Sequence, residues 1–389
     1  MSSANTAIPI SQARALVRDL FTPKPWIYWL DLVVTLSVAY TAAGIYLLAP
    51  LFSLEQIVCY FVAGVALFRA ALFMHEVVHF RKGEMVPFKV FWNVMAGIPM
   101  LMPSFLYESH LAHHNTHHYG TGNDGEYLPL GVGGLRNIGR FLTQILGLPI
   151  FVGLRFFLGT PLSFLHPQLR EWTLERASSF VINFSYRRAL PDNAPRRVWA
   201  WMELACFLRA CLIFIVPLLP QFPLIRVVQI YSLALLALGL NHIRTLVAHR
   251  YLSTGSKMSF LEQFGDSVNV TGTPFVTELL FPVGLRYHAL HHLFPSIPYH
   301  NLGIAHRRLV ANLPADSVYH MANHSGFWSA LRELLRNSRQ AMQNPPPGAD
   351  AWYRRRQEEL VAVAPELDGN DSAQAELPPP AKCEPFPVD

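Results

Sequence analysis

The chain has 389 residues, of which 51% are hydrophobic and only 15% are charged, whereas soluble proteins average about 25% charged residues. The formal net charge is +5, and no dense basic run with interleaved aromatic residues suggests binding to nucleic acid. This composition excludes an ordinary soluble domain and predicts an integral membrane protein.

Four apolar runs are long enough to cross a bilayer as helices, which takes about 17–25 residues. Asp31 is the only charged residue in the first run, and Arg69 is the only one in the second. We predict membrane-spanning helices in residues 26–52, 57–74, 199–220 and 222–240.

Three histidine motifs follow or lie near these apolar runs. Residues three or four apart lie on one face of a helix, so the histidines of each motif can approach a metal ion together. Eight histidines exceed the four ligands that one tetrahedral zinc accepts, so we predict two metal ions. The motifs consist of His75 and His79, of His110, His113 and His114, and of His288, His291 and His292.

Two further apolar stretches are predicted not to cross the membrane. Residues 88–106 contain two prolines and separate the first two histidine motifs, which must lie on the same side of the bilayer. We therefore expect a re-entrant or interfacial helical pair. Residues 141–158 contain Pro149 and Arg155, which favours a helix lying in the interface.

Basic residues adjoin the same ends of the four predicted spans. Because cytoplasmic loops are enriched in Lys and Arg, we expect both termini and all three histidine motifs to face the cytoplasm. Residues 217–223 then form the outer turn. The basic residues concerned are Arg14, Arg18, Lys24, Arg81, Lys82, Lys89, Arg250, Lys257, Arg286, Arg307 and Arg308.

The chain divides into three parts by composition. Residues 1–25 form a cytoplasmic segment, and residues 26–330 form an all-α membrane domain with four transmembrane helices and a cytoplasmic helical cap that holds the histidine-rich site. Residues 331–389 become rich in proline and acidic residues, so we expect a mostly disordered tail with a short helix at residues 352–363.

The three motifs, H-x-x-x-H, H-x-x-H-H and H-x-x-H-H in that order, resemble those of the membrane fatty acid desaturase and hydroxylase superfamily. The resemblance covers about residues 25–325. The stretch YHALHHLFPSIPYHNL, which contains the third motif, is similar to the corresponding region of sphingolipid desaturases. The resemblance implies four membrane helices under a cytoplasmic cap, with two Fe²⁺ ions held by histidines.

The resemblance also implies one more ligand late in the fourth span, where His242 and His249 are both candidates. We favour His249, because it lies nearer the cytoplasmic end, and we expect His242 to support a ligand or to line a substrate tunnel. His117 and His118 extend the second motif and are possible additional ligands. Beyond the metal ligands, no catalytic side chain is predicted.

Several other polar residues have two interpretations. Asp124 and Glu126 could orient a ligand imidazole by accepting its second N–H, or could belong to the turn that Asn-Asp-Gly predicts. Asp266 and Asn269, which precede the third motif, could likewise either orient a ligand imidazole or belong to a turn. Glu76 could form a hydrogen bond with a neighbouring imidazole. Four later histidines are expected to lie outside the site: His300, His306, His320 and His324.

The resemblance implies an O₂-dependent oxidase, since an unactivated methylene needs an oxidant stronger than any side chain. The main expectation is desaturation of a lipid acyl chain, and the alternative is a hydroxylase or ketolase acting on a lipid, carotenoid or alkane. The sequence shows no cysteine cluster for iron–sulfur binding and no flavin or haem motif, so electrons must come from a separate ferredoxin- or cytochrome-type donor.

Two other classes of membrane protein share some of these features. His75-Glu76-Val77-Val78-His79 also matches H-E-x-x-H, the signature of zinc proteases in which the glutamate is the general base. A zinc protease would need only this motif and one distant third ligand, so the other two histidine motifs would have no function in it. A metal transporter would need ionisable residues along its spans, and few are present.

Overall fold

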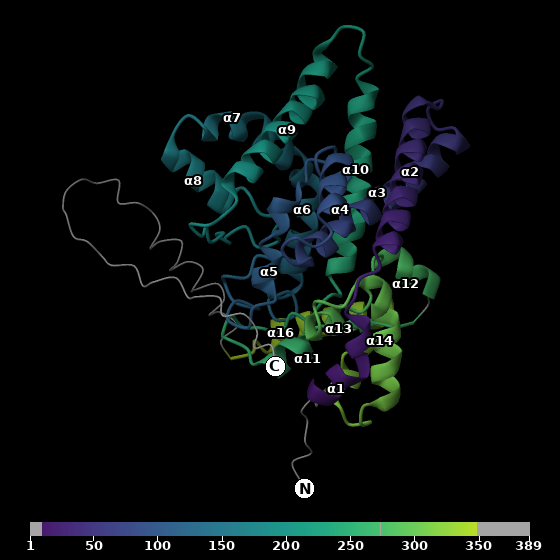
Figure 1. Cartoon of the computed structure of the whole chain (residues 1–389), viewed down its shortest axis with the longest axis vertical. Coiled ribbons are helices and arrows are strands. Elements are labelled where there is room, and N and C mark those ends of the chain that lie inside the picture. The colour runs from purple at the N-terminus through teal and green to yellow at the C-terminus, as the bar shows by residue number, and fades with distance from the viewer. Residues whose placement is uncertain (1–9, 273, 348–389) are drawn as a thin grey trace, which may run out of the picture.

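The computed structural model describes residues 10–272 and 274–347 and is mostly helical, as predicted (Figure 1). The α-helices are α1 (Ile10–Val17), α2 (Pro25–Leu48), α3 (Leu54–His79), α4 (Val86–Trp92), α5 (His110–His113), α6 (Leu135–Leu154), α7 (Thr160–Ser163), α8 (Pro167–Arg176), α9 (Arg196–Ile215), α10 (Ile225–Thr245), α11 (Phe260–Asp266), α12 (Pro274–Leu280), α13 (His288–Leu293), α14 (Tyr299–Asn312), α15 (Val318–Met321) and α16 (Phe327–Gln343). Shorter 3₁₀ or π segments are η1 (Arg18–Leu20), η2 (Asn93–Gly97), η3 (Ser104–Tyr107), η4 (Arg155–Gly159) and η5 (Val216–Leu218), and two strands are β1 (Asn269–Val270) and β2 (Asn323–His324).

In the described part of the chain, five helices are long and apolar enough to cross a membrane, one more than the four predicted from the sequence. The additional one is Leu135–Ser163, which joins α6, η4 and α7 and includes the stretch expected to lie in the interface. Four match the predicted spans: Pro25–Leu48, Leu54–His79, Arg196–Leu218 and Ile225–Thr245.

Several charged residues within these apolar helices pair with residues of other helices. Arg69 of α3 donates to Asp31 of α2 at 2.6 Å, so the only charges in the first two predicted spans neutralise each other. Arg155, where α6 passes into the π-helical η4, donates to the fully buried Glu203 of α9, which also accepts from Arg170. Such pairing is expected because an isolated charge among apolar groups is costly.

Close helix packing brings α10 against α3. Gly64 of α3 lies where a Cβ atom would come within 2.2 Å of Leu236 on α10, so a larger residue would push the helices apart. α3 also packs along α2, beginning at Ser53, whose hydroxyl accepts a hydrogen bond from the backbone N–H of Gln56. These contacts fix the C-terminal ends of α3 and α10, which carry histidines.

The stretch of residues 88–106 is broken into short pieces, as its prolines predicted. α4 and η2 are followed by a turn and by η3, and none of these is among the helices long enough to span a bilayer. Trp92 donates to the carbonyl of Ala70 at 2.8 Å, which ties the end of α4 to α3. The chain is thereby returned toward the end of α3 before the second histidine motif.

The long helices α2, α3, α9 and α10 extend toward one end of the molecule, and α1, α11, α13, α14 and α16 gather at the other (Figure 1). Within the second group, β1 pairs in parallel with β2. An apolar core there includes Leu290 and Leu293 of α13 and Leu302 and Leu309 of α14. This helical layer meets the end of α3, where Nε2 of His79 lies 3.1 Å from Nε2 of His291 in α13.

The boundary expected at residue 331 falls inside a helix. α16 continues to Gln343, because Phe327, Ala330 and Leu334 form an apolar stripe that packs with Ile138 and Phe141 of α6. The helix expected at residues 352–363 lies outside the described residues.

Candidate metal centre

The first histidine motif occupies the last two turns of α3. His75 and His79 are four residues apart and present their rings on one face, with centroids 4.9 Å apart. His75 is 5% exposed, and neither of its ring nitrogens has a hydrogen-bond partner. A buried imidazole without any partner is costly unless something else occupies its lone pair.

The second motif begins with the one-turn helix α5 and ends just beyond it. His110 and His113 are almost fully buried. His114 follows as the C-terminal cap, and its Nε2 lies 3.0 Å from Nε2 of His110. Helical spacing thus brings His110 and His114 together and directs the ring of His113 to a different group.

Residues 267–270, which follow α11, form an extended segment that positions both His249 and the third motif. On one side, His249 pairs with Ser267 in an antiparallel bridge, and Arg250 N–H donates to the carbonyl of Asp266 at 2.6 Å. On the other side, Val270 N–H donates to the carbonyl of Arg286 at 2.7 Å, just before α13. As a result, Nε2 of His288 lies 2.9 Å from Nε2 of His249.

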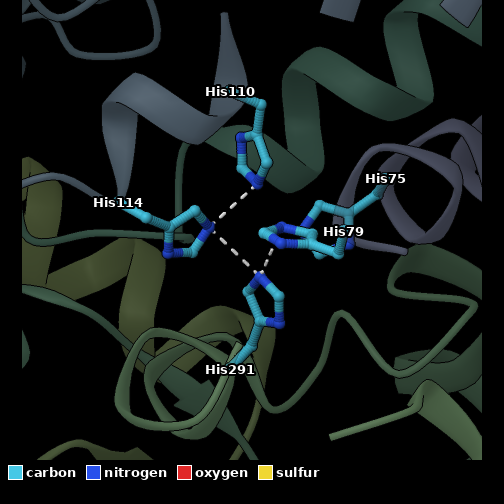
Figure 2. A group of neighbouring side chains, drawn as sticks. All are labelled: His75, His79, His110, His114 and His291. Carbon is cyan, nitrogen blue, oxygen red and sulfur yellow. Dashed lines mark hydrogen bonds between the residues drawn. The ribbon is translucent and has the colours of Figure 1, made fainter. Parts of the chain in front are cut away.

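All nine histidines favoured by the sequence come together in two groups, and within each group the nitrogen atoms lie within 4.8 Å of one another. Figure 2 shows the first group, whose rings converge from α3, the second motif and α13. The five-histidine group contains His75, His79, His110, His114 and His291. The four-histidine group contains His113, His249, His288 and His292.

The spacing of these nitrogens fits metal coordination. Nε2 of His291 lies 3.1 Å from Nε2 of His79 and 3.2 Å from Nε2 of His114. Two nitrogens at about 2.1 Å from one ion, at right angles to each other, would be roughly 3 Å apart. Imidazole is also a donor that suits iron and zinc. The residues present therefore fit two metal ions with nitrogen ligands.

Carboxylates orient two of the imidazoles, which is the role considered for them from the sequence. Asp124 lies 2.8 Å from Nδ1 of His113, and Glu126 lies 2.8 Å from Nδ1 of His110. A carboxylate beside Nδ1 keeps the proton there, so Nε2 presents its lone pair. The Asn-Asp-Gly turn is formed as well, because the Asp124 carboxylate accepts from the backbone N–H groups of Gly120 and Glu126.

A tyrosine connects the third carboxylate with His249. Tyr119 donates its O–H to Asp266 at 2.8 Å, and its oxygen lies 2.8 Å from Nδ1 of His249. Since the phenol proton goes to Asp266, the phenol oxygen accepts the Nδ1–H of His249. Tyr127 also donates to Asp266, at 2.9 Å. Asp266 therefore orients His249 through Tyr119 rather than directly.

Electrostatics keep most of these rings neutral. Burial, reinforced by neighbouring imidazoles, holds the pKa of His114, His291 and His292 well below the usual value. His113 is the exception: burial alone would lower its pKa, but the charge of Asp124 and its hydrogen bond raise it. Burial raises the pKa of Glu126 to about 7. Neutral imidazole is the form that donates a lone pair to a metal.

The other histidines lie outside both groups. His242 is buried, stacks on Phe141 with centroids 4.7 Å apart, and directs Nδ1–H to the carbonyl of Leu238. His117 and His118 follow the second motif without joining a group, and the remaining histidines past the third motif make other contacts. Among these, His300 accepts from Lys24 N–H and His306 lies 2.8 Å from the Tyr319 hydroxyl.

Glu76 does not hydrogen-bond a neighbouring imidazole, contrary to one expectation. Its carboxylate accepts from the Tyr28 hydroxyl at 2.6 Å and from Tyr299 N–H at 3.2 Å, and it is 3.7 Å from Nδ1 of His75. Glu76 belongs to neither histidine group. The general-base role that H-E-x-x-H would require is therefore not supported by the geometry.

Sequence reasoning missed two tyrosines beside the histidines. Tyr119 bridges to His249, and Tyr107 stacks on His110 with centroids 4.7 Å apart while donating to Glu126. Nothing in their spacing distinguished them from core aromatics. Asn269 supports the third motif by accepting from Leu290 N–H at 3.1 Å. Arg286, one of the basic residues used to predict the membrane topology, is buried and bonds Glu278.

Comparison with known proteins agrees with this arrangement. The family described as fatty acid desaturase matches residues 56–323, which include all three histidine motifs. A protein named ceramide hydroxylase, from Caulobacter vibrioides, is 41% identical over 342 residues, covering 87% of this chain and 97% of that protein. The chain therefore belongs to the fatty acid desaturase family, within the superfamily of membrane lipid desaturases and hydroxylases.

Proposed function

We propose that this protein is a membrane-bound, O₂-dependent di-iron hydroxylase that acts on a ceramide-type lipid. The single observation that carries the proposal is the pair of histidine groups in a chain 41% identical to a protein named ceramide hydroxylase. The sequence favoured desaturation, with hydroxylation as the alternative. Because the relative is named a hydroxylase, hydroxylation becomes the main proposal in place of desaturation.

We assign the five-histidine group to one iron and the four-histidine group to the other, with all nine histidines as ligands. When bound, the two irons would activate O₂, which supplies the oxidising power that no side chain has. His75 offers the clearest support for this assignment, because both of its nitrogens are buried and without a partner. Asp124, Glu126 and Tyr119 would keep the Nδ1 protons in place.

The reaction balances with an external electron donor. One oxygen atom of O₂ replaces a C–H bond with C–OH, and the other leaves as water. Two electrons and two protons are consumed, and the sequence shows no iron–sulfur, haem or flavin motif that would supply the electrons. We infer a separate ferredoxin- or cytochrome-type protein as the source of electrons.

We infer four membrane crossings rather than five. Three candidate spans lie between the second and third motifs, yet His114 and His291 lie 3.2 Å apart. An odd number of crossings would place these motifs on opposite sides of the bilayer. Leu135–Ser163, which contains Pro149 and passes into a π-helix at Arg155, is the one that we take not to traverse. The basic flanks then put the centre on the cytoplasmic side.

The proposal is tested by expressing the chain in a bacterium supplied with ceramide and analysing the lipids by mass spectrometry. Hydroxylation adds one oxygen atom to ceramide, whereas desaturation removes two hydrogens. We expect the oxygen-bearing product with the wild-type protein and not with His291→Ala. A product that has only lost hydrogen would return the assignment to desaturase, and unchanged ceramide in both cultures would count against it.

A further inference from the structure

Arg244, near the end of α10, differs from the other buried arginines of the described chain. Its side chain bonds only Asn241 Oδ1, at 3.3 and 3.4 Å, and Thr245 Oγ1, at 3.4 Å. The others each have a carboxylate: Arg155 pairs with Glu203, Arg188 with Glu108 at 2.5 Å, and Arg286 with Glu278 at 2.9 Å. Within residues 10–272 and 274–347, no ion pair is found for Arg244.

The guanidinium of Arg244 has more N–H donors than its hydrogen bonds use, and it is buried from solvent. Arg244 is 9% exposed, and arginine carries five N–H donors and no acceptor. A buried charge that lacks an ion-pair partner and makes only long hydrogen bonds is costly, and a ligand that supplies acceptor atoms would reduce that cost. The ligand must bring acceptor atoms. Oxygen atoms that match a planar fork of N–H groups satisfy this requirement.

The position of Arg244 relates it to both histidine groups. It precedes His249 by five residues, and the Tyr251 hydroxyl donates to the carbonyl of the adjacent Thr245 at 2.6 Å. After burial and other charged neighbours, the charge of Arg244 contributes to lowering the pKa of His249 and of His288 in the four-histidine group. The same charge also contributes to lowering the pKa of Glu126, whose carboxylate is the partner of His110 in the five-histidine group. The ring of that same Tyr251 packs against the ring of His249, with centroids 5.4 Å apart, so the end of α10 that carries Arg244 lies beside the four-histidine group.

We propose that Arg244 binds the amide carbonyl and hydroxyl oxygens in the polar backbone of the lipid substrate, and so determines which carbon faces the histidine groups. This inference rests on the proposed function. A methylene chain offers no feature by which one carbon is told from the next, so position must be measured from a polar group. A guanidinium fixed on a rigid helix beside the metals supplies that reference point.

The inference predicts that the shape of the guanidinium matters as well as its charge. Arg244→Lys keeps the positive charge beside Glu126 and His249 but loses the planar fork, whereas Arg244→Met loses both. We expect both variants to weaken ceramide binding by about ten- to a hundredfold, the loss typical of hydrogen bonds to a charged group. Arg140→Lys, at an exposed position of α6, is the matched control and should bind as the wild type does.

Binding is measured with the full chain loaded with iron and reconstituted in nanodiscs, without O₂ or reductant, so that no turnover occurs. The probes are radiolabelled ceramide and a radiolabelled alkane of the same chain length. Ceramide affinity should fall in both Arg244 variants while alkane affinity and iron content remain unchanged. If Arg244→Lys binds ceramide as tightly as the wild type does, the role is electrostatic only and the inference is overturned.

Turnover separates this inference from the proposed function. With an electron donor added, Arg244→Lys should spread the hydroxyl group over several carbons and raise KM more than it lowers kcat. If the wild type binds ceramide in an Arg244-dependent way but forms no hydroxylated product, the proposed function fails and the binding role stands. If the wild type hydroxylates ceramide and both variants keep its affinity and product position, the proposed function stands and the role given to Arg244 fails.

Discussion

Nδ1 of His113 lies 2.8 Å from a carboxylate oxygen of Asp124, and both side chains are almost completely buried. The two residues are eleven positions apart and belong to different local structures, a one-turn helix and the turn that follows it. The carboxylate holds the proton on Nδ1 and raises the pKa of the imidazole against the effect of burial. Nε2 is then left free to face the four-histidine group.

The first prediction concerns this carboxylate. Asp124→Asn removes the charge and keeps the size of the side chain, and its single amide oxygen can accept from only one of the N–H groups of Gly120 and Glu126. We expect metal affinity to fall by about ten- to a hundredfold, as is usual when the partner of a ligand histidine is lost. Titration of the apoprotein with Fe²⁺ measures this. Asn123→Ala, exposed in the same turn, should behave as the wild type does, and equal affinity in all three proteins would contradict the role given to Asp124.

The second prediction compares two tyrosines that share Asp266. Tyr119→Phe removes a donor to Asp266 and the acceptor for His249, whereas Tyr127→Phe removes a donor to Asp266 and the acceptor for the Ser253 N–H but leaves the bond between Tyr119 and His249. Each should lower the free energy of unfolding by about 1–3 kcal/mol, because a buried carboxylate loses a hydrogen bond. Only Tyr119→Phe should also weaken Fe²⁺ binding. Parallel loss of metal affinity in both variants would mean that Asp266, not the bridge, is decisive.

The third prediction tests the protease reading of the first motif. Glu76→Gln retains an acceptor for Tyr28 or Tyr299, so the protein should keep its metals and lose only about 1–3 kcal/mol of unfolding free energy. Metal analysis and denaturant unfolding measure the two effects. Glu55→Gln, exposed in the first turn of the same helix, serves as the control. Peptide cleavage by the wild type that disappears in Glu76→Gln would revive the protease assignment.

The fourth prediction separates His242 from His249, the two ligand candidates that follow residues 222–240. His249→Ala removes a member of the four-histidine group, so bound iron should fall from about two ions per chain toward one. His242→Ala removes a ring that stacks on Phe141 and should cost stability without changing the iron content. Elemental analysis of purified protein gives the ratio. Loss of iron in His242→Ala alone would reverse the preference for His249.

Much of the fold was predictable because hydrophobic length is a local property. The runs beginning near Trp26 and Ile57 needed only their composition to be recognised as spans. Leu135–Ser163 was harder to interpret, because Pro149 and Arg155 argue against a span while the described helix is long enough for one. The extent of α16 past residue 331 depended on its contact with α6, which composition does not reveal.

The sequence by itself determined which histidines share a helical face, since that follows from 3.6 residues per turn. It could not decide how nine rings divide into five and four, because His113 and His114, adjacent in the chain, belong to different groups. That division, the bridge from Asp266 through Tyr119 to His249, and the lone guanidinium of Arg244 come only from the tertiary structure. The first two depend on contacts between segments more than a hundred residues apart, and the third depends on the lack of an ion-pair partner. The spacing of residues along the sequence reveals neither kind of feature.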